Sequence, residues 1–166
     1  MWRSPVSWGW AISRRCWRGC KRIIRAETAK HAERTRIIDI DAISSEVVGE
    51  AIKIHRQLGP GLLESVYETV LAASLSRRGF MVARQVPIAI EYDGLTIDAA
   101  FRVDLLIEAR LVVEIKAVEQ IQKVHAKQLL TYLRLMKQPV GLLLNFSGLT
   151  MKEGIRRLVN NYQPID

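Results

Sequence analysis

Four charged side chains alternate with apolar ones along two neighbouring stretches of the sequence. The first stretch carries Arg102 and Asp104, and the second carries Glu114 and Lys116. Such alternation predicts two strands, because successive side chains of a strand point to opposite faces. If the chain turns at Ala109, antiparallel pairing sets Asp104 opposite Glu114. The same register sets Arg102 opposite Lys116, so that all four side chains share one face.

Two directly opposed carboxylates repel each other, because their Cβ atoms lie roughly 4.5–5.5 Å apart, unless a cation compensates their charge. Carboxylate oxygens at this separation suit Mg²⁺ or Mn²⁺, hard ions that bind oxygen ligands, water and phosphate. Lys116 would then hold and polarise an attacking water beside the metal, and Arg102 would contact a phosphate. A second interpretation stays open: any half-solvated strand shows this alternation, and the two cations could neutralise the two acids across the ladder.

The opposite face of the same hairpin is apolar throughout, which supports the register. The turn itself contains neither Gly nor Asn, the residues that usually fix a hairpin. In this register the apolar pairs are Val103 with Ile115, Leu105 with Val113, and Ile107 with Leu111.

The elements before the hairpin follow from helical periodicity on both sides of the break at Gly59-Pro60-Gly61. Residues 44–58 carry apolar side chains at helical spacing after the capping signature Ser44-Ser45-Glu46. A second apolar stripe ends at Arg77-Arg78-Gly79, which predicts a second helix.

The remaining elements are predicted from alternation, turn signals and length. Pro87 favours an edge position for the first strand, and Asp93-Gly94 is a strong signal for a tight turn. The predicted order of the whole chain is α, α, β, β, β, α, β, α. After the two helices come strands over 80–92, 95–107 and 111–117, a helix over 120–137, a strand over 140–146 and a last helix over 150–162.

Length and composition indicate one globular domain. The chain has 166 residues, of which 49% are hydrophobic and 25% are charged. No run approaches the roughly 18 apolar residues of a transmembrane helix. Cys16 and Cys20 are too few and too close in sequence for a disulfide scaffold. We therefore expect a reducing compartment, the cytoplasm, and no membrane partner.

The net charge of +8 arises in the first 38 residues. They contain ten of the 25 Lys and Arg residues, two of the 17 Asp and Glu residues, and all four Trp residues. The rest of the chain is balanced in charge, so the overall charge does not indicate a basic binding face there. We interpret residues 1–38 as a basic extension, disordered or upstream of the true start, and residues 39–166 as the folded domain. An organelle transit peptide stays an alternative.

An aspartate on one strand followed by Glu-x-Lys on the next, in this element order, resembles the PD-(D/E)XK nuclease superfamily. Here the pattern is Asp104 followed by Glu114-Ile115-Lys116, with Val103 where the name has proline. The segment Gly61-Leu62-Leu63-Glu64-Ser65-Val66-Tyr67 also matches the motif that names the GxxExxY family, which is placed within that superfamily. The resemblance covers residues 45–161. It implies a restriction-endonuclease-like fold with an αβββαβ core, in which helices flank a central mixed sheet.

The resemblance also implies a set of metal ligands. Asp104, Glu114 and the backbone carbonyl of Ile115 would hold Mg²⁺, and Lys116 would position the attacking water. Glu64 resembles the helix-borne acid of the nuclease core, which helps to bind the metal directly or through water. An acid in the first turn of a helix also complements the helix dipole, so a purely structural role for Glu64 stays open.

Three further residues have implied contacts near the substrate. Gln128 and Tyr132 resemble the Gln-x-x-x-Tyr motif of RecB-like nucleases, whose side chains approach the active site and the DNA, and their spacing puts both on one helical face. Tyr67 follows Glu64 by one turn, either as a substrate contact or as a core aromatic with its hydroxyl satisfied near the site. His125 shares the face of Gln128 and is expected to be a partly buried helix residue rather than a ligand.

Together these features predict metal-assisted hydrolysis of phosphodiester bonds in nucleic acid, DNA rather than RNA, with Mg²⁺ or Mn²⁺ as cofactor. The alternative is a nuclease-fold module with a weak or idle site that binds nucleic acid or protein. The complete set of Asp104, Glu114 and Lys116 favours the enzyme, because a degenerate module is expected to have lost at least one of them. The sequence leaves open whether the chain acts as a homodimer.

Overall fold

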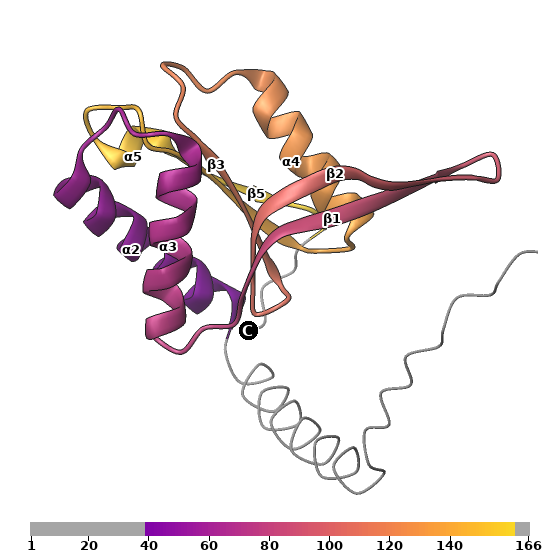
Figure 1. Cartoon of the computed structure of the whole chain (residues 1–166), viewed down its shortest axis with the longest axis horizontal. Helices are drawn as coiled ribbons and strands as arrows, with labels where there is room; N and C mark the ends of the chain where they lie inside the picture. Colours follow the sequence, from indigo (N-terminus) through magenta and orange to yellow (C-terminus); the bar gives the residue numbers. More distant parts are fainter. Residues whose placement is uncertain (1–38, 162–166) are drawn as a thin grey trace, which may run out of the picture. The chain divides into compact units, whose positions relative to one another are not determined.

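The computed structural model describes residues 39–161, in which a five-stranded sheet lies between helices (Figure 1). The interpretation of residues 1–38 as an extension concerns a segment outside this range. The elements in chain order are α2 (Ile40–Leu58), α3 (Glu64–Arg77), β1 (Val82–Tyr92), β2 (Leu95–Ile107), β3 (Leu111–Lys116), α4 (Lys123–Leu135), β4 (Val140–Asn145), α5 (Met151–Gly154) and β5 (Ile155–Val159).

The strands lie side by side in the order β1-β2-β3-β4-β5. Strands β3 and β4 pair in parallel, whereas the other neighbouring strands are antiparallel. Parallel pairing of consecutive strands requires a crossover connection, which α4 supplies. Every residue of β4 and all but the last residue of β3 are buried, so these two strands form the centre of the sheet. The predicted mixed sheet with flanking helices is confirmed.

Helices α2 and α3 cover one face of the sheet, and α4 covers the other (Figure 1). Beneath α4, Leu129 and Leu133 pack with Val112 of β3 and Leu143 of β4. Because side chains two positions apart share one face of a strand, Glu114 points to the α4 side like Val112. The buried side chains of α2 recur every three or four residues, as a helix with one apolar stripe requires: Ile40, Ile43, Val47, Ala51 and Ile54.

The β2–β3 hairpin has the predicted register at its closed end. The ladder consists of Leu105 with Val113, Leu106 with Val112, and Ile107 with Leu111. It ends there, before the predicted pairs of Asp104 with Glu114 and of Arg102 with Lys116. The expectation that Val103 faces Ile115 is wrong, because Val103 packs with Val112 in the cluster beneath α4. Strand β2 separates from β3 at Asp104. In the part of β2 that precedes Asp104, the side chains no longer alternate between the faces in step with those of β3.

The turn of this hairpin is fixed by a buried acid in place of Gly or Asn. Glu108 and Ala109 have φ angles of 52° and 53°, in the left-handed region that glycine favours. The carboxylate of Glu108 accepts a hydrogen bond from the Met81 N–H at 2.9 Å, and the Glu108 N–H donates to the Met81 carbonyl at 2.9 Å. These contacts with the segment before β1 hold the turn in its strained conformation.

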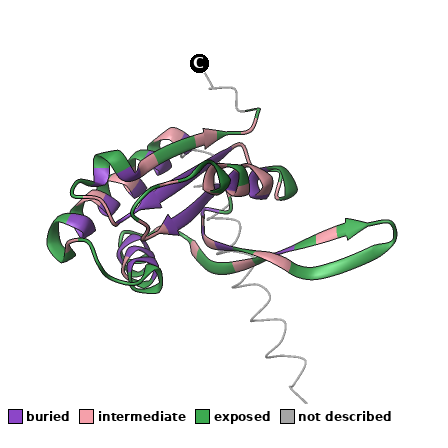
Figure 2. Ribbon diagram, turned by 90° about the horizontal axis from the view of Figure 1, so that it is seen from above, coloured by how far each residue is buried: buried purple, intermediate pink, exposed green. Residues whose placement is uncertain are grey.

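The hairpin of β1 and β2 extends beyond the sheet as a two-stranded arm (Figure 2). The tight turn predicted at Asp93-Gly94 joins its strands. Near the tip, Tyr92, Leu95 and Ile97 are exposed. Strand β1 forms one edge of the sheet, as Pro87 predicts.

The first described helix begins a full turn before its predicted start at Ser44. Its N-cap is Asp39, and Ser44 lies inside the helix, where its hydroxyl donates to the Ile40 carbonyl at 2.8 Å. Serine has two ways to satisfy its hydroxyl, at a cap or against the preceding turn, and the sequence alone does not separate them.

The helix predicted over 150–162 is also wrong. A single turn, α5, ends at Gly154, and the chain continues as β5, which pairs with β4 from Val140 to Leu144. The apolar residues that suggested a helix belong to a strand. The buried edge of β4 needs hydrogen-bond partners, and this pairing overrides the local periodicity of the sequence.

The sequence contains no apolar run long enough for a transmembrane helix. Among residues 39–161, no helix has the length and apolar character needed to span a membrane.

Candidate functional site

Asp104 lies at the point where β2 separates from β3. Its Oδ2 atom accepts a hydrogen bond from the Ile115 N–H at 2.8 Å, so that a side chain takes the place of the backbone ladder. The N–H and C=O of one strand residue point to the same edge, so the Ile115 carbonyl also faces the β2 side. Burial raises the pKa of Asp104 above its ordinary value, although the hydrogen bond from Ile115 and the charge of Lys116 oppose the rise.

With 4% of its side chain exposed, Glu114 is the most deeply buried acid of the carboxylate cluster, which consists of Glu64, Asp104, Glu114 and the neighbouring Lys116. Its Oε1 atom accepts a hydrogen bond from Lys116 Nζ at 2.7 Å. Its Oε2 atom is buried and has no hydrogen-bond partner. Burial, and then the negative charge of Asp104, raise the pKa of Glu114 to about 7. This carboxylate therefore has an oxygen available for a cation and an environment that penalises its bare charge.

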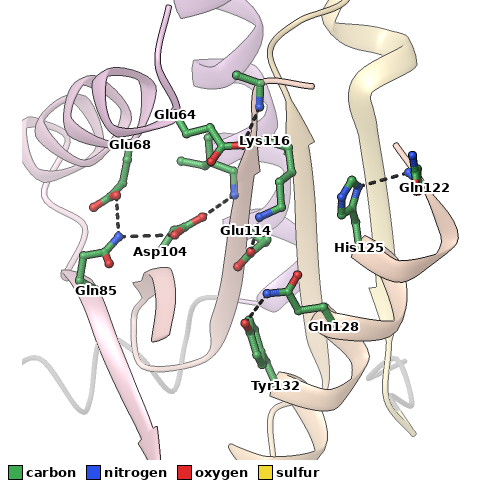
Figure 3. A network of polar contacts seen from close by, with 12 residues as sticks. Glu64, Glu68, Gln85, Asp104, Glu114, Lys116, Gln122, His125, Gln128 and Tyr132 are labelled. Atoms are coloured by element: carbon green, nitrogen blue, oxygen red, sulfur yellow. Dashed lines mark hydrogen bonds and ion pairs between the residues drawn. The ribbon is translucent and has the colours of Figure 1, made fainter. Parts of the chain in front are cut away.

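Lys116 is a half-buried ammonium group held between acids (Figure 3). Burial would lower its pKa, but the hydrogen bond and charge of Glu114 and the charges of Glu64 and Asp104 outweigh that influence, and the pKa is raised. Lys116 thus keeps its positive charge at neutral pH. Its ion pair is with Glu114 on its own strand, whereas Arg102 is exposed and pairs with neither acid. The interpretation of Arg102 as their structural counter-charge therefore fails.

Glu64 is the first residue of α3 and ties that helix to the end of β3. Its Oε1 atom accepts a hydrogen bond from the Ala117 N–H at 3.0 Å. Its charge contributes to the raised pKa of Asp104 and of Glu114. The structure thus places Glu64 beside the two strand carboxylates, with one oxygen occupied by the backbone.

Glu68 and Gln85, which the sequence analysis missed, support Asp104 from the side of α3 (Figure 3). Gln85 Nε2 donates to Glu68 Oε2 at 2.7 Å and lies 3.4 Å from Asp104 Oδ1, so this amide bridges the two acids. Arg84 Nε donates to the other oxygen of Glu68 at 2.8 Å. The spacing of Glu68 one helical turn after Glu64 is a signal in the sequence. Gln85 gives no such signal, because nothing in the sequence indicates its left-handed φ of 51°.

Gln128 and Tyr132 project from α4 toward the cluster (Figure 3). Gln128 Nε2 donates a hydrogen bond to the hydroxyl of Tyr132, and the Tyr132 ring lies 5.4 Å from that of Phe101 between centroids. Burial raises the pKa of Tyr132, and the charge of Glu114 adds to the rise. The predicted shared face is confirmed. His125 is a half-buried residue in the first turn of α4, as expected, and its Nδ1 accepts a hydrogen bond from the Gln122 N–H at 3.2 Å.

Tyr67 is fully buried, and its hydroxyl serves the loop before α3. The hydroxyl donates to the Gly59 carbonyl at 2.7 Å and accepts from the Leu62 N–H at 3.2 Å. Its ring stacks on Phe146 with centroids 4.3 Å apart. Of the two interpretations, the structure fits a core aromatic whose hydroxyl is satisfied near the site.

The donor set fits a hard divalent cation held by two carboxylates. Asp104 and Glu114 provide oxygen donors from adjacent strands, and Glu114 Oε2 is buried without a partner. Oxygen-only donors suit Mg²⁺ or Mn²⁺, which keep several water ligands. Among residues 39–161, no three His, Cys, Asp or Glu side chains gather closely enough to hold one ion. Asp104, Glu114 and the Ile115 carbonyl are the oxygen groups of this site that could hold such an ion.

Asn145 ends β4 beside Lys116 and holds the chain that follows β3. Its amide donates to the Val118 carbonyl at 2.7 Å and accepts from the Val118 N–H at 3.1 Å. The sequence analysis missed Asn145, although a single polar residue at the end of an apolar strand is a signal in the sequence.

Comparison with known proteins places this arrangement in a family. The family model described as the PD-(D/E)XK nuclease superfamily matches residues 41–158, which include every residue of the cluster. No curated protein and no solved structure matches the chain.

Proposed function

Because the chain belongs to the PD-(D/E)XK nuclease superfamily, we propose that it is a metal-dependent nuclease that hydrolyses phosphodiester bonds, in DNA rather than RNA. The observation that carries the proposal is the convergence of Asp104 and Glu114 at the start of the β2–β3 separation, with Glu114 Oε2 buried and without a partner. A buried carboxylate oxygen that no donor satisfies is costly unless a cation binds it.

The ligands in this proposal are Asp104, Glu114 and the carbonyl of Ile115, with Glu64 acting through water. A bound Mg²⁺ or Mn²⁺ lowers the pKa of a ligated water and neutralises charge that develops on the phosphate. The acids contribute by holding their oxygens in place before the cation arrives. Ile115 fixes Asp104, Lys116 fixes Glu114, and Ala117 fixes Glu64.

Lys116 contributes hydrogen bonds from a permanent ammonium group. A protonated amine cannot accept a proton, so Lys116 orients the attacking water and stabilises the charged phosphate. Its attachment to Glu114 Oε1 at 2.7 Å keeps the group within the cluster.

The remaining contacts in this proposal concern the nucleic acid strand. Gln128 and Tyr132 align it from α4, and their mutual hydrogen bond fixes both side chains. Arg102 is exposed on β2 and contacts a phosphate. Tyr67 acts on substrate indirectly, by holding the loop before Glu64.

Finer assignments belong to the same proposal. The motif from Gly61 to Tyr67 supports membership of the GxxExxY family, and the cysteine content supports a cytoplasmic location. A homodimer that cuts both strands stays open. The alternative function is a nuclease-fold module with an idle site that binds nucleic acid or protein.

The proposal is tested by incubating the full chain with single- and double-stranded DNA and RNA, each with Mg²⁺, Mn²⁺ or EDTA. We expect cleavage that requires the metal and is lost in Asp104→Asn and Lys116→Met. Asp98→Asn makes the same chemical change at an exposed position farther along β2, and Lys152→Met does so on α5; both should cut like the wild type. Binding of nucleic acid without any cleavage would support the module instead, and equal cleavage by all variants would refute the site.

A further inference from the structure

A pocket lies directly beside the carboxylate cluster. Its volume is about 380 Å³, near the lower limit for sites that take small organic groups. It shares Glu64 with the cluster, and Ala117 in its wall follows Lys116 in the chain. Its lining consists of Gly61, Leu62, Leu63, Glu64, Ala117 and Ser147.

The walls of this pocket suit an uncharged, flat group with polar edges. Leu63 exposes 73% of its surface and Leu62 exposes 37%, so water contacts apolar side chains at the mouth. The only charged lining residue is an acid, Glu64, so nothing in the lining attracts a phosphate. Ser147 supplies a hydroxyl that can donate or accept a hydrogen bond.

The two sides of the pocket are held together from beneath. The hydroxyl of Tyr67 fixes the loop that carries Leu62, through the hydrogen bonds with Gly59 and Leu62. The ring of Tyr67 stacks on Phe146, which immediately precedes Ser147 on the opposite side. The pocket is thus formed before any ligand arrives, and binding does not have to order it.

We propose that this pocket receives one unpaired nucleobase of the substrate, next to the phosphate that is cleaved. The inference rests on the proposed function and deepens it, because it names single-stranded or locally unpaired nucleic acid as the substrate. A nucleobase combines an apolar face, which leucine side chains can contact, with hydrogen-bonding edges that Ser147 can reach. A base within a duplex is stacked and paired, and it must leave both arrangements before it can enter.

The test compares one oligonucleotide as a single strand, as a duplex, and as a single strand in which single bases are replaced by abasic sites. The full chain is assayed with Mn²⁺ for cleavage, and in EDTA for binding by fluorescence anisotropy. We expect the single strand to be cut at least about 10-fold faster than the duplex, and an abasic site at one position next to the scissile phosphate to abolish that advantage.

Two variants probe the pocket itself. Leu63→Ser removes an exposed apolar wall without disturbing the core, and Ser147→Leu fills the pocket; each should lower cleavage of the single strand about 10-fold and weaken its binding in EDTA. Leu149→Ser is the matched control, because Leu149 is 93% exposed and lies outside this pocket.

The outcomes separate the inference from the proposed function. Metal-dependent cleavage that is equal on single strand and duplex, and unchanged in Leu63→Ser and Ser147→Leu, overturns the base pocket and leaves the nuclease standing. The absence of cleavage on every substrate overturns the proposed function, and the base pocket with it.

Discussion

Replacing Glu114 by Gln is expected to stabilise the metal-free protein above neutral pH. The Glu114 carboxylate is buried, and this burial, followed by the charge of Asp104, raises its pKa to about 7. Glutamine has nearly the same size but carries no charge. Glu114→Gln therefore removes the free-energy cost of an ionised group that the fold holds away from water.

The sign and size follow from proton linkage. In the unfolded chain Glu114 titrates near its ordinary pKa of 4.5, so between that value and about 7 the folded chain binds more protons than the unfolded one. The free energy of unfolding thus falls as the pH rises through this window. One pKa unit corresponds to about 1.4 kcal/mol, which gives a loss of roughly 3 kcal/mol from this one group.

The assay is guanidinium denaturation in EDTA at a series of pH values from 5 to 8. At pH 5 the wild type and Glu114→Gln should be close in stability, whereas at pH 8 the variant should be the more stable, by up to roughly 3 kcal/mol. Glu91→Gln, an exposed acid on the β1–β2 arm, should follow the wild type. Parallel pH profiles for the wild type and Glu114→Gln would refute the argument from burial.

Three other variants probe contacts around the site. Gln85→Gly removes the amide between Glu68 and Asp104 and relieves a left-handed φ of 51°, so cleavage should fall while the denaturation midpoint does not; a lower midpoint would contradict this. Tyr67→Phe removes two hydrogen bonds from the loop before α3 and should cost about 1–2 kcal/mol by denaturation, with an unchanged stability arguing against the tether. Gly154→Ala would place a Cβ 2.1 Å from the Asn145 carbonyl oxygen and should cost about 1–3 kcal/mol, measured as a lower melting temperature; an unchanged melting temperature would show that β4 and β5 can move apart.

The β2–β3 hairpin shows how much of the site a sequence can predict. Alternation of charged and apolar residues predicts this register, because a slip of one residue would carry Leu111, Val113 and Ile115 to the face that holds Glu114 and Lys116. The three pairs from Leu105 to Ile107 obey it. The pattern could not reveal that the two strands separate at Asp104. In the sequence, charged and apolar residues continue to alternate beyond the last pair of the backbone ladder. That separation leaves the Asp104 carboxylate to bind the Ile115 N–H.

Contacts between segments far apart in sequence were not predictable from pattern. Glu108 holds a turn without Gly or Asn by binding Met81, and Gln85 bridges two acids from a strained backbone position. The strand β5 was mistaken for a helix because its apolar residues fit both periods. Only the unpaired edge of β4, which no local window contains, decides between them.

The β1–β2 arm carries a risk of aggregation that its composition offsets. Its outer strand, β1, has no neighbouring strand on one side among the described residues, so its backbone groups could template pairing with another chain. Pro87 lacks an N–H and interrupts such a template. Glu91, Asp93 and Asp98 stand among the exposed apolar residues of the tip, so that two copies of the arm repel each other.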